Sequence, residues 1–125
     1  GHGVGVFSNV HQGPQGITKL NKIPLKPGMI LSIEPGVYLE GKLGIRLENL
    51  VYVKKNNSQT WQKKEFLSFE TLTLVPFERN LIERKLLSND DLQWLNSYHQ
   101  NVYKRLSSYL VVSERKWLSK ACEKL

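Results

Sequence analysis

The sequence is poor in cysteine and in long apolar runs, and each shortage excludes a class of protein. Cys122 is the only cysteine among 125 residues, so neither an intramolecular disulfide nor a cysteine metal cluster can form. No run approaches the roughly 18–20 consecutive apolar residues of a membrane-spanning helix, and no secretory signal opens the sequence. We therefore expect no membrane partner and a cytoplasmic location, which the low cysteine content fits.

Acidic residues are also scarce, which leaves a formal net charge of +7 from 18 basic and 11 acidic side chains. A nucleic-acid interface gathers its basic residues on one face together with stacking aromatic residues. Here they are scattered pairs, so a solvated surface is the expectation and a nucleic-acid-binding module the weaker alternative: Lys54-Lys55, Lys63-Lys64, Arg84-Lys85, Lys104-Arg105 and Arg115-Lys116.

The first three-fifths of the chain has the pattern of strands and turns. Residues 1–11 are glycine-spaced and β-branched without a helical pattern, so we expect an opening strand. Further on, β-branched and alternating segments are separated by Gly, Pro and Asn clusters. The pattern predicts strands at 28–34, 37–40, 45–55 and 66–75, with turns at 41–44 and 56–58.

The remainder is predicted to be helical. Ser88 and Asp91 are spaced as a capping box, which marks a helix start. Strands followed by helices indicate an α+β fold. Residues at steps of three and four then predict one face of a helix, in which we expect His99 to pack among apolar residues with a hydrogen bond: Leu92, Leu95, His99, Val102, Leu106 and Tyr109. A second short helix is expected to carry Trp117, Leu118, Ala121 and Leu125.

Glu34 and Glu48 are the most informative acidic pair. They are equally distant from Gly41, which lies in the turn segment EGKLG. A hairpin centred on Gly41 would place them directly opposite each other, with Cβ atoms about 4.5–5.5 Å apart. Like charges so placed destabilise a sheet unless something neutralises them. A divalent cation would do so.

Two alternatives to a metal stay open at this point. Arg46 lies on the same strand face as Glu48 and can form a structural ion pair with either glutamate. Two close carboxylates can also share a proton. The Pro35-Gly36 interruption can also shift the hairpin register.

His2 and His11 are further candidate site residues, although loop histidines often have no catalytic role.

Three segments together resemble the X-Pro aminopeptidases (aminopeptidase P) of the pita-bread metallopeptidase family: GHGVGVFSNVHQGP, IEPGVYLEGKLGIRLEN and FLSFETLTLVP. The following helical stretch resembles the C-terminal tail of the long, three-domain branch. The resemblance implies the second half of a pita-bread catalytic domain at residues 1–80. It also implies a helical tail at 81–125, packed on the same domain.

The resemblance also implies a site with two divalent metal ions, most often Mn, with Zn or Co possible. His2 matches the ligand histidine, Glu34 the first glutamate ligand and Glu48 the glutamate that bridges both metals. His11 matches a histidine that contacts the substrate, and Tyr38 and Arg46 match groups that orient ligands and substrate. The implied activity is hydrolysis of the bond between an N-terminal residue and a following proline.

The family also uses two aspartate ligands upstream of the GHGVG motif. The only aspartates here, Asp90 and Asp91, lie in the predicted helix start and cannot replace them. We therefore expect a piece of a longer enzyme or half of a split one, inactive and weakly metal-binding alone, which associates with its missing N-terminal half or as a homodimer. The alternative is a non-catalytic pita-bread homologue that acts as a binding module.

Overall fold

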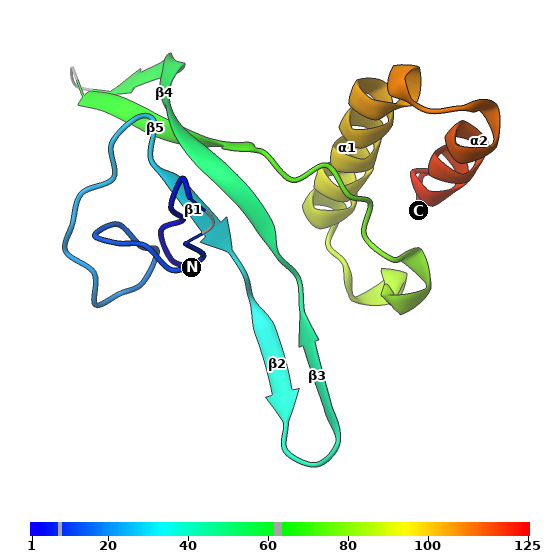
Figure 1. The fold of residues 1–125 in the computed structure, drawn as a ribbon, viewed down its shortest axis with the longest axis horizontal. Coiled ribbons are helices and arrows are strands. Elements are labelled where there is room, and N and C mark those ends of the chain that lie inside the picture. The colour runs from blue at the N-terminus through cyan, green and yellow to red at the C-terminus, as the bar shows by residue number, and fades with distance from the viewer. Residues whose placement is uncertain (8, 62–63) are drawn as a thin grey trace. The chain divides into compact units, whose positions relative to one another are not determined.

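The computed structural model describes residues 1–7, 9–61 and 64–125. Strands come first and helices follow, as expected for an α+β chain (Figure 1). The chain divides into two compact units, residues 1–73 and 74–125, which we call the strand unit and the helical unit.

A three-stranded antiparallel sheet forms the centre of the strand unit. Strand β4 (Asn49–Trp61) lies between β1 (Ile30–Ile33) and β5 (Lys64–Thr71). Leu31 pairs with Val51, so their side chains share one face of the sheet. The buried core lies on that face, with Leu31, Val51 and Val53 packed against Leu25 and Met29.

A two-stranded hairpin extends from this sheet (Figure 1). It consists of β2 (Gly36–Leu39) and β3 (Leu43–Arg46), with Gly36 opposite Arg46 and Leu39 opposite Leu43. The turn contains Gly41 at a φ of 66°, a left-handed conformation that favours glycine. The predicted centre of the hairpin is therefore confirmed.

Other strand predictions need correction. The strand predicted at 45–55 is interrupted, because β3 ends at Arg46 and β4 begins at Asn49. The turn predicted at 56–58 is wrong, because β4 continues to Trp61. Asn56 still pairs with Phe66 while Thr60 pairs with Glu65, so these turn-favouring residues shift the register of the strand without reversing it.

The expected opening strand is also wrong within the described part of residues 1–11. Only isolated bridges form there, between His2 and Gly16 and between Gly3 and Leu31. A Cβ atom on Gly3 would lie 2.1 Å from the carbonyl oxygen of Gln12. The segment therefore folds back too tightly to form an extended ladder, and its glycines permit that approach.

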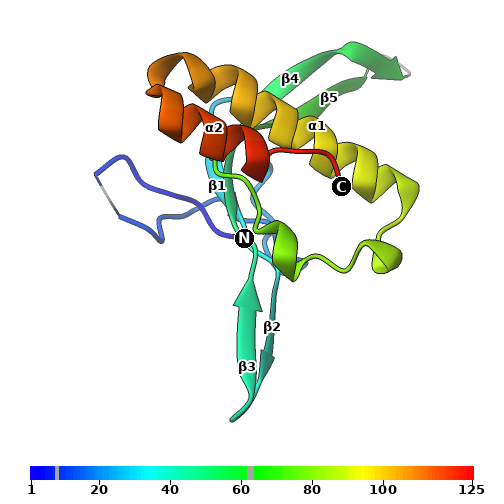
Figure 2. The same ribbon diagram turned by 90° about the vertical axis from the view of Figure 1, so that its right-hand side faces the viewer.

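Two α-helices with three 3₁₀ turns make up the helical unit. Helices α1 (Asn89–Leu106) and α2 (Val112–Ala121) lie side by side (Figure 2), and the turns are η1 (Arg79–Leu81), η2 (Arg84–Leu86) and η3 (Ser107–Tyr109). The core contains Tyr98 and Val102 of α1 and Leu118 of α2. Among the described residues, no helix combines the length and apolarity needed to cross a membrane.

The predicted start of α1 is confirmed. The amide of Asp91 donates to Ser88 Oγ, and the amide of Ser88 donates to Asp91 Oδ2, both at 3.1 Å. The hydrogen bond from the Ser88 side chain lowers the pKa of Asp91. A carboxylate at this position also interacts favourably with the positive end of the helix dipole.

Side chains of α1 form hydrogen bonds with backbone groups of the segment that follows β5. The hydroxyl of Tyr98 donates to the carbonyl of Val75 at 2.8 Å, and the amide of Phe77 donates to His99 Nε2 at 3.0 Å. The strand predicted at 66–75 ends earlier, at Thr71, and the helix side chains bind backbone groups of the segment beyond it. His99 is fully buried, as expected of a packing histidine with a hydrogen bond.

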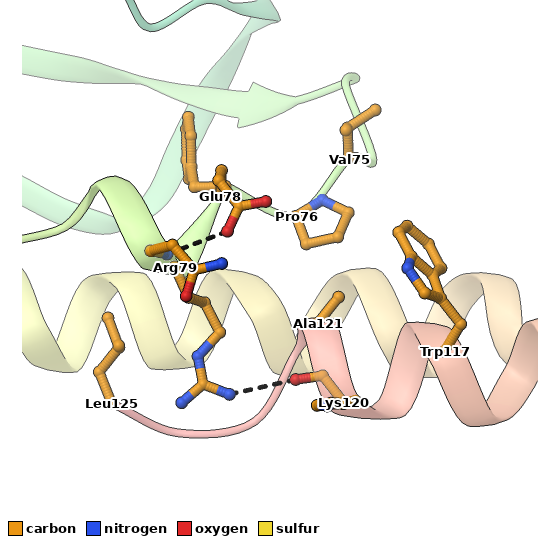
Figure 3. A pocket seen from close by; sticks show the side chains of 10 residues that line it. Val75, Pro76, Glu78, Arg79, Trp117, Lys120, Ala121 and Leu125 are labelled. Carbon is orange, nitrogen blue, oxygen red and sulfur yellow. Dashed lines mark hydrogen bonds between the residues drawn. The ribbon is translucent and has the colours of Figure 1, made fainter.

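An open pocket of about 630 Å³ lies between the Val75–Asn80 segment and the end of α2 (Figure 3). The guanidinium of Arg79 donates to the carbonyl oxygens of Lys120 and Lys124, each at 3.1 Å. Arg79 thus binds a carbonyl of the last turn of α2, at Lys120, and a carbonyl of the segment beyond the helix, at Lys124. These hydrogen bonds hold the C-terminal segment. The expectation that Leu125 lies in the second helix is wrong, because α2 ends at Ala121.

Candidate metal centre

Glu34 and Glu48 stand opposite each other in one continuous register. The last pair of β1 and β4 is Ile33 with Asn49, and the first pair of β2 and β3 is Gly36 with Arg46. Both pairs are centred on Gly41, so the Pro35-Gly36 interruption separates the strands without shifting their register. In the gap, the amide of Leu47 donates to the carbonyl of Pro35 at 3.1 Å.

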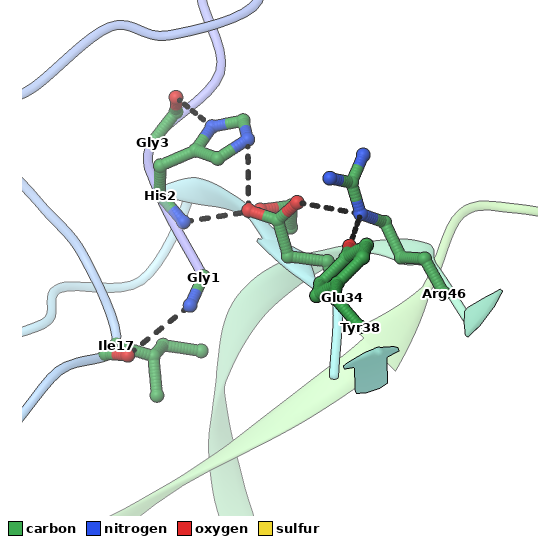
Figure 4. Close-up of polar contacts among 8 residues, drawn as sticks. Gly1, His2, Gly3, Ile17, Glu34, Tyr38 and Arg46 are labelled. Atoms are coloured by element: carbon green, nitrogen blue, oxygen red, sulfur yellow. Dashed lines mark hydrogen bonds and ion pairs between the residues drawn. The ribbon is translucent and has the colours of Figure 1, made fainter. Parts of the chain in front are cut away.

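His2, in the opening segment, lies beside Glu34 (Figure 4). Its Nε2 lies 3.1 Å from Glu34 Oε1, and both side chains are about one-fifth exposed. One potential ligand atom from each of His2, Glu34 and Glu48 lies within 4.8 Å of the others. The predicted convergence of the two carboxylates is therefore confirmed, with a histidine beside them.

The hydrogen bonding of His2 indicates which of its two ring nitrogens carries the proton. Nδ1 of His2 is 2.9 Å from the carbonyl oxygen of Gly3. A carbonyl can only accept, so the proton is assigned to Nδ1. The lone pair of Nε2 then faces a carboxylate oxygen, and two acceptors at this distance require a cation or a second proton between them.

The donor set fits a divalent metal ion. One imidazole nitrogen and two carboxylates are ligands that Mn and Zn accept. Ligand atoms that each bind one metal at about 2.0–2.2 Å are held roughly 3 Å apart. The separation of 3.1 Å between His2 Nε2 and Glu34 Oε1 has this magnitude.

Among the described residues, Arg46 forms an ion pair with Glu34, and its guanidinium is shared with Tyr38. Its Nε donates to the hydroxyl of Tyr38 at 2.9 Å and lies 3.8 Å from Glu34 Oε2. The hydrogen bond with Tyr38 raises the pKa of the Arg46 guanidinium, and the charges of Glu34 and Glu48 contribute further. The anticipated ion pair thus exists, but one cation cannot neutralise two carboxylates.

Glycines make room for the Tyr38 ring on the same face. A Cβ atom on Gly36 would lie 2.7 Å from the Tyr38 hydroxyl, and one on Gly44 would lie 2.9 Å from its ring. Gly44 is directly opposite Tyr38 in the hairpin. The ring can therefore cross the hairpin and reach Arg46 only because both positions lack side chains.

All six site residues predicted from the sequence gather in this cluster. His11 joins through its ring, whose centroid is 4.2 Å from that of His2. Sequence reasoning missed Ser32, whose hydroxyl donates to Glu34 Oε1 at 3.1 Å. The sequence indicated this contact only through the position of Ser32, two residues before Glu34 and therefore on the same strand face. Asp91, by contrast, caps a helix.

Family models account for most of the chain. Residues 1–55 match the model of metallopeptidase family M24, and residues 65–125 match the model of the C-terminal region of peptidase M24. The first match contains every residue of the cluster.

Curated relatives match over nearly the whole chain. An uncharacterized peptidase of Schizosaccharomyces pombe is 45% identical over 124 residues, which are 96% of this chain and 21% of the relative. A probable Xaa-Pro aminopeptidase P of Fusarium vanettenii is 47% identical over 113 residues, 87% of this chain and 18% of the relative. The chain thus spans about a fifth of the length of these relatives.

A solved structure shares the fold. The X-prolyl aminopeptidase of Caenorhabditis elegans, described as a cytosolic enzyme with a di-nuclear active site, superposes with a TM-score of 0.87 at 38% identity. The match covers 99% of this chain and 21% of that one. The resemblance to the pita-bread aminopeptidases is therefore confirmed, and the chain belongs to metallopeptidase family M24.

Proposed function

We propose that this chain is the C-terminal part of a dinuclear-metal aminopeptidase that hydrolyses the bond between an N-terminal residue and a following proline. The observation that carries the proposal is the convergence of His2, Glu34 and Glu48. An imidazole lone pair and two facing carboxylates repel one another unless a cation or an added proton lies between them, and a divalent cation can bind all three. The Xaa-Pro aminopeptidases among the relatives suggest the substrate class, peptides with proline in the second position.

His2, Glu34 and Glu48 would hold two divalent ions, most readily Mn, with Zn or Co as alternatives. When bound, the ions would supply a water acidic enough to attack the scissile carbonyl at neutral pH. The carbonyl of Gly3 keeps Nδ1 of His2 protonated, so that Nε2 offers its lone pair.

Three further side chains would act on the substrate and on the ligands. His11, packed against the His2 ring, is placed to contact the peptide. Arg46 lies beside Glu34 and is itself held by the hydroxyl of Tyr38, so this pair would fix the orientation of the Glu34 carboxylate.

The remaining ligands would come from a longer protein. The only aspartates of this chain, Asp90 and Asp91, both lie in the first turn of α1. We propose that two aspartates of the preceding N-terminal half complete the site, and that residues 1–80 complete the catalytic domain before a helical tail at 81–125. The complete protein is proposed to be a cytoplasmic homodimer.

The test uses the full-length protein and a peptide with proline in the second position. With Mn present, we expect release of the N-terminal residue. Glu48→Gln should reduce kcat at least 100-fold, because it removes a metal-bridging charge. Glu40→Gln, in the exposed turn of the same hairpin, is the matched control and should retain activity.

Two outcomes would contradict the proposal. The first is full activity of the Glu48→Gln variant. The second is a wild-type protein that binds the metal and the peptide without hydrolysing it, which would support the non-catalytic binding module instead.

A further inference from the structure

Ser32 is a fully buried polar residue that contacts two of the three candidate metal ligands. Its exposed fraction is 0%. Its hydroxyl oxygen lies 3.0 Å from the backbone nitrogen of His2 and 3.1 Å from Glu34 Oε1. His2 and Glu34 are far apart in sequence, so this single side chain connects two segments that meet only in the folded chain.

The direction of both hydrogen bonds is determined by chemistry. The backbone N–H of His2 can only donate, so Ser32 Oγ accepts from it. The ionised carboxylate of Glu34 can only accept, so the hydroxyl proton points to Oε1. The result is a directed chain of hydrogen bonds from His2 through Ser32 to Glu34, and a hydroxyl is well suited to its centre because it donates and accepts at once.

The backbone around Ser32 brings the segments together closely enough for these contacts. The amide of Ser32 donates to the carbonyl of His2 at 2.9 Å. A Cβ atom on Gly1 would lie 1.8 Å from the carbonyl oxygen of Ser32. A side chain at position 1 would therefore push the opening segment away from β1, so glycine there is a condition for the contact between Ser32 and His2.

The same carboxylate oxygen receives the Ser32 proton and faces His2 Nε2. A hydrogen bond to one lone pair of Oε1 fixes the rotation of the Glu34 carboxylate and leaves its other lone pair for a cation. Without the hydroxyl, the carboxylate would be held only through Oε2, which lies 3.8 Å from Nε of Arg46, and Oε1 could turn away from His2.

We infer that Ser32 is a positioning residue of the metal site, which orients the Glu34 carboxylate and holds His2 against it through one hydroxyl. The inference rests on the proposed function, because it concerns the same site. Ser32 touches neither substrate nor metal, and it acts through Glu34 and His2. Loss of such a partner of a metal ligand typically weakens metal binding about 10- to 100-fold.

The test compares three variants of the full-length protein. Ser32→Ala removes the hydroxyl without adding volume, and Ser32→Thr restores it. Thr73→Val is the matched control, because the Thr73 hydroxyl also accepts from a backbone amide of the same unit, that of Leu50 at 2.8 Å. Mn affinity is measured by calorimetry, and the thermal midpoint of the metal-free protein is measured in parallel.

We expect Ser32→Ala to weaken Mn binding about 10- to 100-fold, Ser32→Thr to recover most of the loss, and Thr73→Val to keep wild-type affinity while lowering the thermal midpoint. A purely structural role would lower the midpoint of Ser32→Ala and leave its Mn affinity unchanged, which would overturn the inference. Equal Mn affinity of Ser32→Thr and Ser32→Ala would also overturn it. A wild-type protein that binds no Mn would overturn the proposed function instead.

Discussion

Glu34 and Glu48 face each other across a hairpin whose register is the same on both sides of the Pro35-Gly36 interruption. A proline in this gap removes one backbone donor and keeps the strands from forming a continuous ladder. The two carboxylates thus occupy a short stretch with little backbone pairing, next to His2 and Arg46. We therefore expect the two carboxylates to destabilise the metal-free protein and to stabilise the metal-bound protein.

Glu48→Gln should stabilise the metal-free protein and destabilise the metal-bound one. Removing a like charge opposite Glu34 relieves a repulsion of about 0.2–1 kcal/mol. With Mn, the wild type gains the free energy of binding, and the variant gains much less. Thermal midpoints with chelator and with Mn measure both signs, and the same sign under both conditions would contradict the metal role of Glu48.

Gly3→Ala should weaken metal binding more than Gly13→Ala. A Cβ atom on Gly3 would lie 2.1 Å from the backbone oxygen of Gln12, whereas one on Gly13 meets nothing within 4 Å. The carbonyl of Gly3 accepts from His2 Nδ1, so its displacement turns the His2 ring. We expect about a tenfold or larger loss of Mn affinity for Gly3→Ala only, and equal affinities by calorimetry would contradict it.

Ser88→Ala should destabilise the start of α1. The Ser88 hydroxyl accepts from the Asp91 amide at 3.1 Å, and loss of such a cap costs about 1 kcal/mol. Ser97→Ala, at an exposed position within α1, is the control and should be neutral or slightly stabilising. Hydrogen exchange of the α1 amides measures the difference, and equal exchange in both variants would contradict the role of the cap.

The contact between His99 and Phe77 should weaken at acidic pH. Nε2 of His99 accepts from the Phe77 amide, so the contact requires a neutral ring. Burial lowers the pKa of His99, and the charge of Arg79 lowers it further. In the unfolded chain the pKa of His99 is about 6.5, and the contact stabilises the fold fully above that pH. The stabilisation is lost as the pH falls from there through the lower pKa of the folded state.

His99→Gln provides the control for this pH dependence, because its amide can still accept a hydrogen bond but cannot titrate. We expect the protection factor of the Phe77 amide to fall between pH 7.5 and 5 in the wild type and to change less in the variant. The same fall in both proteins would show that another group is responsible.

Much of the site could be predicted from the sequence, because its geometry follows from local rules. Turn residues around Gly41 and the two-residue period of strands place Glu34, Tyr38, Arg46 and Glu48 on one face of the hairpin. The capping box of α1 is likewise encoded within four residues. Such features depend on neighbours in the chain, so their spacing is enough to predict them.

Other features depend on contacts between distant segments, which no spacing specifies. The turn expected at 56–58 became a register shift because pairing with β5 continued past it. The strand expected to reach Val75 ended at Thr71, and Tyr98 and His99 bind the backbone of the segment that follows. Ser32 gave only a positional signal. The sequence by itself determined that Glu34 opposes Glu48. Only the tertiary structure brought His2 to them, because glycine-permitted contacts with Ser32 hold segments that are 30 residues apart.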